Sequence, residues 1–261
     1  MYNSEFEGKT IVITGGAGDI GKAVASEFIR RKSRVILIDI NGDKLSEAKQ
    51  ALGKEAETYV CDVGSWENVE KTIGEITKKN RIDYLFNNAG IQGEFRKTHE
   101  YPPDDFERVI KVNVLGVFYV LKAVSLSMID NHGGAIVNAA SMAGIHGPPN
   151  MIAYGASKSA VIGITETAAV DLAPYHIRVN SISPAFMDTK HLWQRQVDLQ
   201  AEADSQYYDR DPKIVAEQMI NAVPMRRCGT LDEISGVVAF LLSNDAGYMT
   251  GTNIPIAGGI L

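Results

Sequence analysis

The chain has 261 residues, of which 45% are hydrophobic and 22% are charged, an ordinary balance for a soluble protein with a sizeable core. Its formal net charge of −6 argues against nucleic acid or an anionic membrane as the main partner. Only two cysteines occur, the start does not resemble a signal peptide, and no apolar run approaches the roughly 20 residues of a membrane helix. We therefore expect a cytoplasmic protein with reduced thiols.

Strand-like runs alternate with helix-length amphipathic segments along the whole chain, without repeats or linkers. This alternation indicates parallel βαβ units, and so a single α/β domain, residues 1–261, with a doubly wound sheet covered by helices on both faces. The first helix should begin near Gly21 and bury Val24 and Phe28. The predicted strands are 10–14, 34–40, 57–63, 84–87, 135–139, 178–183 and 253–257.

The segment 188–223 interrupts this alternation. It combines Trp193 and two tyrosines with many Gln, Asp and Glu residues, a pattern that predicts one or two surface helices. About 35 residues of this kind inside a compact domain are usually functional. We interpret the segment as a substrate-binding lid.

A glycine cluster, Gly15-Gly16-Ala17-Gly18-Asp19-Ile20-Gly21, stands between the first strand and the first helix. Glycines there allow close approach of a pyrophosphate, and the helix offers its N-terminal N–H groups to the phosphates. Asp39, at the end of the second strand, is placed to accept hydrogen bonds from an adenosine ribose, and its charge disfavours the 2′-phosphate of NADP. The alternative for Asp39 is a helix N-cap or turn residue. The loop and Asp39 together predict NAD as the cofactor of a Rossmann-like fold.

Tyr154 and Lys158 are four residues apart, which places both side chains on one face of a helix. An ammonium beside a phenol favours the phenolate, so we expect the pKa of Tyr154 to fall toward the working pH. Such a tyrosine can transfer protons at near-neutral pH. Ser141 lies upstream, directly after an apolar strand.

In combination, these motifs resemble those of the short-chain dehydrogenase/reductase family, in its NAD-dependent branch of about this length. The resemblance covers nearly the whole chain and includes Asn87-Asn88-Ala89-Gly90. It implies a catalytic tetrad of Asn113, Ser141, Tyr154 and Lys158. It further implies cofactor contacts by Gly15, Gly18, Asp19, Ile20, Gly21, Asp39, Asp62, Val63, Asn88, Ala89, Gly90, Tyr154, Lys158, Pro184, Met187 and Thr189.

Two positions depart from the family pattern. Asp19 replaces a glycine of the loop; at the start of the helix it would serve as an N-cap, and its charge near the phosphates would favour NAD over NADP. Ala185 replaces the glycine after Pro184, a departure that concerns the detail of that turn and not catalysis.

The resemblance implies hydride transfer between NAD and an alcohol or ketone carbon, with Tyr154 as general acid or base. Ser141 would bind the substrate oxygen, Lys158 the nicotinamide ribose, and Asn113 a proton-relaying water. A packing amide at Asn113 and a strand-end cap at Ser141 are the structural alternatives. No histidine or cysteine spacing suggests a metal.

The predicted substrate is a small polar or cyclic secondary alcohol or ketone, such as a polyol, a cyclic diol or a hydroxy acid. The pocket lining implied by the resemblance mixes amide, imidazole and aromatic groups: Gln92, Ser141, Ala143, His146, Tyr154, Phe186 and Trp193. Arg96, Lys97 and Arg195 would either pair with a substrate anion or be solvated surface charges. Rival functions are a carbonyl or 3-oxoacyl reductase and a non-catalytic nucleotide sensor. The C-terminal segment, residues 248–259, resembles the end of family members, in which this region packs between subunits. The resemblance therefore implies a homotetramer.

Overall fold

The computed structural model describes residues 4–260 and contains one seven-stranded parallel sheet, in the strand order β3-β2-β1-β4-β5-β6-β7. The order reverses between β1 and β4, as expected for a doubly wound Rossmann-like fold. The strands are β1 (Thr10–Thr14), β2 (Arg34–Asp39), β3 (Ala56–Val60), β4 (Tyr84–Asn87), β5 (Gly134–Ala139), β6 (Ile177–Pro184) and β7 (Asn253–Ile256).

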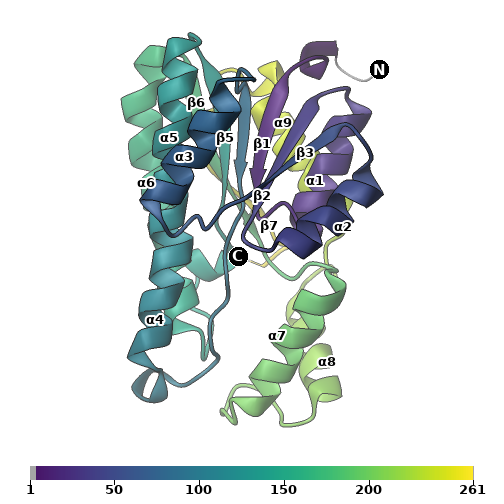
Figure 1. The fold of residues 1–261 in the computed structure, drawn as a ribbon. Helices are drawn as coiled ribbons and strands as arrows, with labels where there is room; N and C mark the ends of the chain where they lie inside the picture. Colours follow the sequence, from purple (N-terminus) through teal and green to yellow (C-terminus); the bar gives the residue numbers. More distant parts are fainter. Residues whose placement is uncertain (1–3, 261) are drawn as a thin grey trace.

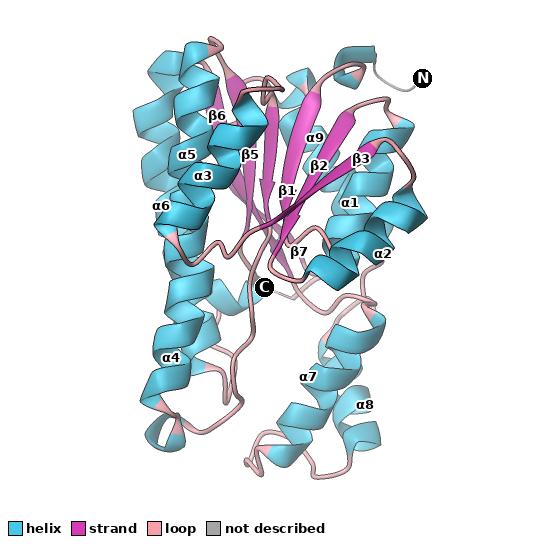
Figure 2. Cartoon of the chain, in the orientation of Figure 1, coloured by secondary structure: helices cyan, strands magenta, loops and turns pink. Residues whose placement is uncertain are grey.

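Helices cover both faces of the sheet (Figure 2). The α-helices are α1 (Asp19–Arg30), α2 (Gly42–Leu52), α3 (Trp66–Thr77), α4 (Pro103–Ile110), α5 (Gly116–Asp130), α6 (Ile152–Leu172), α7 (Lys190–Glu202), α8 (Pro212–Ala222) and α9 (Leu231–Leu242). The predicted fold class is therefore confirmed.

Each central strand contributes to two cores, because successive side chains point to opposite faces. Ile11 and Ile13 of β1 pack with Phe28 of α1 and with α9, in the core on one face. Val12 packs with α3 and α5 in the core on the other. The buried residues of both cores are at most 9% exposed, which explains why the central strands read as continuous apolar runs.

The predicted strand boundaries agree with the structure to within one residue, except at the end of the third strand. The third strand ends at Val60 rather than at residue 63, because the Asp62 carboxylate accepts a hydrogen bond from Gly64 N (2.9 Å) and turns the chain toward α3. The second strand ends at Asp39, since Asn41 caps α2 by accepting from Lys44 N.

A continuous helical segment, Pro103–Asp130, combines α4, a π-helical turn (Lys111–Leu115) and α5. Within residues 4–260 it is long and apolar enough to cross a membrane by length and composition alone. The expectation that no segment has this character was wrong. In the structure, Val117, Val120 and Val124 of this helix are buried in the cores against neighbouring strands and helices.

The segment 188–223 contains two helices, α7 and α8, in agreement with the sequence prediction. They project beyond the carboxyl ends of the strands, on the side opposite α4 (Figure 1). Val197 and Ala201 of α7 pack against Val215 and Met219 of α8 in a small separate core. This core packs the two helices against each other beyond the carboxyl ends of the strands.

Candidate active site

A cavity of about 1160 Å³ lies at the carboxyl edge of the sheet and extends from Asp39 to Trp193 of α7. This is where ligands bind in open α/β sheets, and the volume exceeds that of a typical small-molecule pocket. Among the residues predicted for the site, those that line it are Gly15, Gly18, Asp19, Ile20, Asp39, Asn88, Gly90, Gln92, Ser141, Ala143, His146, Tyr154, Lys158, Pro184, Phe186, Met187, Thr189 and Trp193. Outside its lining are Gly21, Asp62, Val63, Ala89 and Asn113.

The glycine loop fits a dinucleotide, because its geometry excludes side chains. A Cβ at Gly21 would lie 2.4 Å from Gly15 O, and one at Gly16 would lie 2.8 Å from Leu37 Cβ. Gly15 also has φ +62°, a conformation that suits glycine. The loop therefore presents bare backbone, and the start of α1 presents unpaired N–H groups, where a pyrophosphate would bind.

Asp39 lines the cavity and also holds the loop. Its carboxylate accepts hydrogen bonds from Ala17 N (3.2 Å) and Asn41 N (3.1 Å). It therefore acts as a turn residue, while its position at the cavity leaves it available to a ribose. Lys44 of α2 lines the same end of the cavity and was not anticipated.

The expectation that Asp19 caps α1 was wrong. Gly18 is the N-cap, and Asp19 is the first helical residue, paired with Lys22 at 3.1 Å. A side chain at that position follows the cap and so cannot satisfy the N–H groups that a cap residue reaches. The dipole still favours its charge there.

The second departure from the family pattern, Ala185, fits the structure. Ala185 donates its N–H to Ile256 O (3.0 Å), and within residues 4–260 it is not among the residues with positive φ. Alanine therefore fits this turn without backbone strain.

The predicted cofactor residues outside the cavity lining have structural contacts. Val63 is buried against the start of α5, where Gly116 leaves room for it. Ala89 N donates to Thr14 Oγ1 (3.0 Å). Direct cofactor contacts by Asp62, Val63 and Ala89 stay predictions.

Lys158 and Tyr154 lie together on α6, as the spacing predicts. Lys158 is 4% exposed; its Nζ donates to Ala139 O at 2.6 Å and lies 5.6 Å from the centroid of the Tyr154 ring. Burial lowers the pKa of Lys158 from its ordinary 10.5 to about 8, because the charged ammonium loses hydration.

Burial also raises the pKa of Tyr154 above its ordinary value of 10, and a hydrogen bond with Ser141 opposes this shift only in part. The expectation of a lowered pKa was therefore wrong for the protein alone. The physical reason is that desolvation of the phenolate outweighs its stabilisation by the hydrogen bond with Ser141. Tyr154 consequently holds its proton at neutral pH.

Ser141 and Asn113 each have structural partners. Ser141 caps a short 3₁₀ helix (Met142–Gly144) by accepting from Ala143 N (3.2 Å), and it lines the cavity beside Tyr154. Asn113 lies in the π-helical turn and donates to Ile91 O (2.8 Å) and Ser157 Oγ (2.9 Å). Its amide hydrogens are thus both used to join the loop after β4 to α6. Its predicted role toward a water stays a prediction.

The substrate end of the cavity also contains side chains that sequence reasoning missed or discounted. Arg195 lines the cavity, whereas Arg96 pairs with Glu94 at 3.5 Å and, like Lys97, lies outside the lining. No sequence signal distinguished Arg195 from these two, since its position depends on how α7 packs. The lining residues not anticipated there include Arg108, Met151, Leu192, Gln196 and Tyr208.

The matches to known proteins agree with this geometry. Residues 9–200 match the family described as short chain dehydrogenase. Levodione reductase of Leifsonia aquatica is 35% identical over 98% of this chain and 95% of its own length. A crystal structure of NAD+-bound xylitol dehydrogenase is 53% identical, with a TM-score of 0.96 over 98% of this chain and 100% of the other. A structure of ElxO with NADP bound is 30% identical, with a TM-score of 0.84 over 97% and 98%.

The chain belongs to the short-chain dehydrogenase/reductase family and is an oxidoreductase of that family. The predicted family is therefore confirmed.

The burial of Lys158 predicts a pH-dependent stability. Because its pKa is about 8 in the folded protein and 10.5 unfolded, the charged ammonium destabilises the fold below pH 8, and this cost disappears as the pH rises to 10.5. We therefore compare the free energy of unfolding of Lys158→Met with that of the wild type at each pH. The difference should favour the variant more at pH 7 than at pH 10, by on the order of 2 to 3 kcal/mol. Urea unfolding of the cofactor-free proteins at both pH values measures this.

The matched control is Lys79→Met, an exposed lysine after α3, which should show no such pH-dependent difference. Equal pH dependence for Lys158→Met and the wild type would contradict the burial argument.

Proposed function

We propose that the chain is an NAD-dependent dehydrogenase that oxidises a small polar secondary alcohol, with an acyclic polyol as its first candidate substrate. The observation that carries the proposal is that one cavity is lined by Asp39, the Tyr154–Lys158 pair and polar side chains of α7. The similarity of the chain to NAD+-bound xylitol dehydrogenase supports both the polyol substrate and the NAD cofactor of the proposal.

The residues present fit the dinucleotide at one end of the cavity. The glycine loop and the start of α1 would hold the pyrophosphate, Asp39 the adenosine ribose, and Lys158 the nicotinamide ribose. Bound NAD+ supplies a hydride acceptor and a positive charge. Asp39 disfavours a 2′-phosphate, although Lys44 lies at the same end.

Tyr154 would exchange the proton of the substrate oxygen, and Ser141 would hydrogen-bond that oxygen as charge develops on it. In oxidation Tyr154 must first lose its proton, which its raised pKa opposes in the protein alone. Positive charge beside the phenol, from Lys158 and the bound cofactor, favours the phenolate needed for this direction.

Reduction of a small ketone is the second candidate function. The protonated form of Tyr154, which burial favours, is the form that donates a proton to an alkoxide. The similarity to levodione reductase supports this direction. Cytoplasmic location and a homotetramer stay predictions from the sequence.

Tyr154→Phe should lower turnover roughly a hundredfold to ten-thousandfold while NAD+ binding survives, because the ring stays and only the proton-transferring hydroxyl is lost. The measurement is NADH absorbance with a panel of polyols, cyclic diols and hydroxy acids, followed in both directions. Tyr207→Phe is the matched control, since Tyr207 is 61% exposed and outside the cavity lining. Near-normal turnover by Tyr154→Phe would remove the proposed role.

Asp39→Ala should reduce the preference for NAD+ over NADP+ by about tenfold or more, since a carboxylate near a phosphate contributes repulsion of this order. The ratio of kcat/KM values for the two cofactors measures it. Asp43→Ala, at an exposed acidic residue near the start of α2 and outside the cavity lining, should leave the ratio unchanged. An unchanged ratio in Asp39→Ala would show that Asp39 does not select the cofactor.

A further inference from the structure

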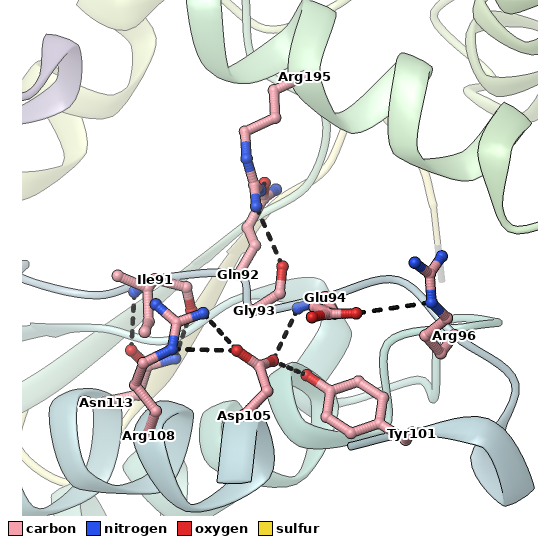
Figure 3. Close-up of polar contacts among 10 residues, drawn as sticks. All are labelled: Ile91, Gln92, Gly93, Glu94, Arg96, Tyr101, Asp105, Arg108, Asn113 and Arg195. Carbon is pink, nitrogen blue, oxygen red and sulfur yellow. Dashed lines mark hydrogen bonds and ion pairs between the residues drawn. The ribbon is translucent and has the colours of Figure 1, made fainter. Parts of the chain in front are cut away.

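Helix α7 is tied to the loop after β4 by side chains at the substrate end of the cavity (Figure 3). Arg195 of α7 donates to Gln92 Oε1 at 2.9 Å and to Gly93 O at 3.2 Å. Gln92 Nε2 in turn donates to Gln196 Oε1 at 3.3 Å. Gln92 is 9% exposed, so both ends of its buried amide are used to hold α7.

The loop that accepts the hydrogen bonds of Arg195 is itself held at both ends by side chains of the helical segment Pro103–Asp130. Asn113 accepts from Ile91 N and donates to Ile91 O, each at 2.8 Å. Asp105 of α4 accepts from Glu94 N at 2.8 Å and from the Tyr101 hydroxyl at 2.6 Å. Arg195 is an exposed residue, and hydrogen bonds to this loop hold its guanidinium at the cavity.

Gly93 stands between these two anchors and admits no side chain. Its φ is +73°, and a Cβ there would lie 2.6 Å from the Tyr101 hydroxyl and 2.6 Å from Val109 Cγ2. The loop thus passes close over α4, and its carbonyl at residue 93 reaches the guanidinium of Arg195 (Figure 3).

Arg195 differs in charge balance from the other two arginines drawn in Figure 3. Arg108 pairs with Asp105, and Arg96 pairs with Glu94. The hydrogen-bond acceptors of Arg195 are neutral oxygens, and among residues 4–260 no carboxylate lies within 4 Å of its guanidinium nitrogens. Its positive charge at the cavity is therefore uncompensated.

The carboxylates that line the cavity gather at the opposite end. Asp19, Asp39 and Glu47 come from α1, β2 and α2, around the predicted cofactor site. The lining around Tyr154 and α7 has amide, hydroxyl, imidazole and guanidinium groups, with no carboxylate in the described part of the chain. An anion at this end would meet a cation and no like-charged neighbour.

We propose that Arg195 binds the carboxylate of a polyhydroxy acid, so that the chain also oxidises such sugar acids and depends on Arg195 to do so. Gln92 is the positioning residue that holds the guanidinium at the cavity. The inference rests on the proposed dehydrogenase function and extends it to a second substrate class.

The chemistry at the carboxylate-bearing substrate is unchanged. The carbinol carbon loses a hydride to NAD+, the oxidant of the proposed function, and the hydroxyl loses its proton to Tyr154 and then to solvent. The products are a keto acid, NADH and one proton, and the carboxylate takes no part in the electron balance.

The experiment compares kcat/KM with NAD+ for xylitol and for its aldonate, xylonate, in the wild type and in variants. Arg195→Gln should lower kcat/KM for xylonate about tenfold, mainly through KM, because the acid loses a charge-assisted hydrogen bond. Xylitol makes no such bond, so its kcat/KM should fall by less than about threefold. Gln92→Glu keeps an acceptor for Arg195 but neutralises its charge, so it should produce the same selective loss. Arg96→Gln is the control and should change neither substrate.

Equal losses for both substrates in Arg195→Gln would overturn the inference, because Arg195 would then only hold α7. A wild type that oxidises xylitol but not xylonate would also overturn it and leave the proposed function standing. Oxidation of neither substrate, or of any alcohol, would contradict both.

Discussion

The site depends on one buried hydroxyl, that of Thr14 at the end of β1. It donates to Asn87 Oδ1 (3.1 Å) and accepts from Asn88 N (2.9 Å) and Ala89 N (3.0 Å). Asn88 Nδ2 returns a hydrogen bond to Thr14 O (3.1 Å). These contacts join the strand that leads into the glycine loop to the strand that leads into the loop holding α7. They do so where the strand order reverses, so the cofactor and substrate ends of the cavity share one rigid edge.

The electrostatics of the catalytic pair follow from burial at that edge. Lys158 reaches the carbonyl of Ala139 at the end of β5, in a position nearly closed to water. In such surroundings an ammonium and a phenol each favour the neutral form. The spacing in the sequence predicted their proximity correctly but not the direction of the Tyr154 shift, because residue spacing carries no information on solvent access.

The fold was predictable because the central strands are buried on both faces and read as apolar runs between amphipathic helices. The two helices of residues 188–223 were also predictable from composition. The roles of Asp19 and Arg195 were less accessible, since they depend on which loop residue begins α1 and on how α7 packs against the loop after β4. Gln92 was predicted at the substrate pocket, and it lines the cavity, yet its amide is used to hold α7.

In the proposed function, substrate and NAD react directly within a single cavity beside Tyr154. The most direct test is the fate of deuterium from a polyol labelled at its carbinol carbons, followed by mass spectrometry of the reduced cofactor. We expect NADH that carries one deuterium from the substrate, with no loss of label to solvent. Unlabelled NADH, or deuterium released to water, would contradict it.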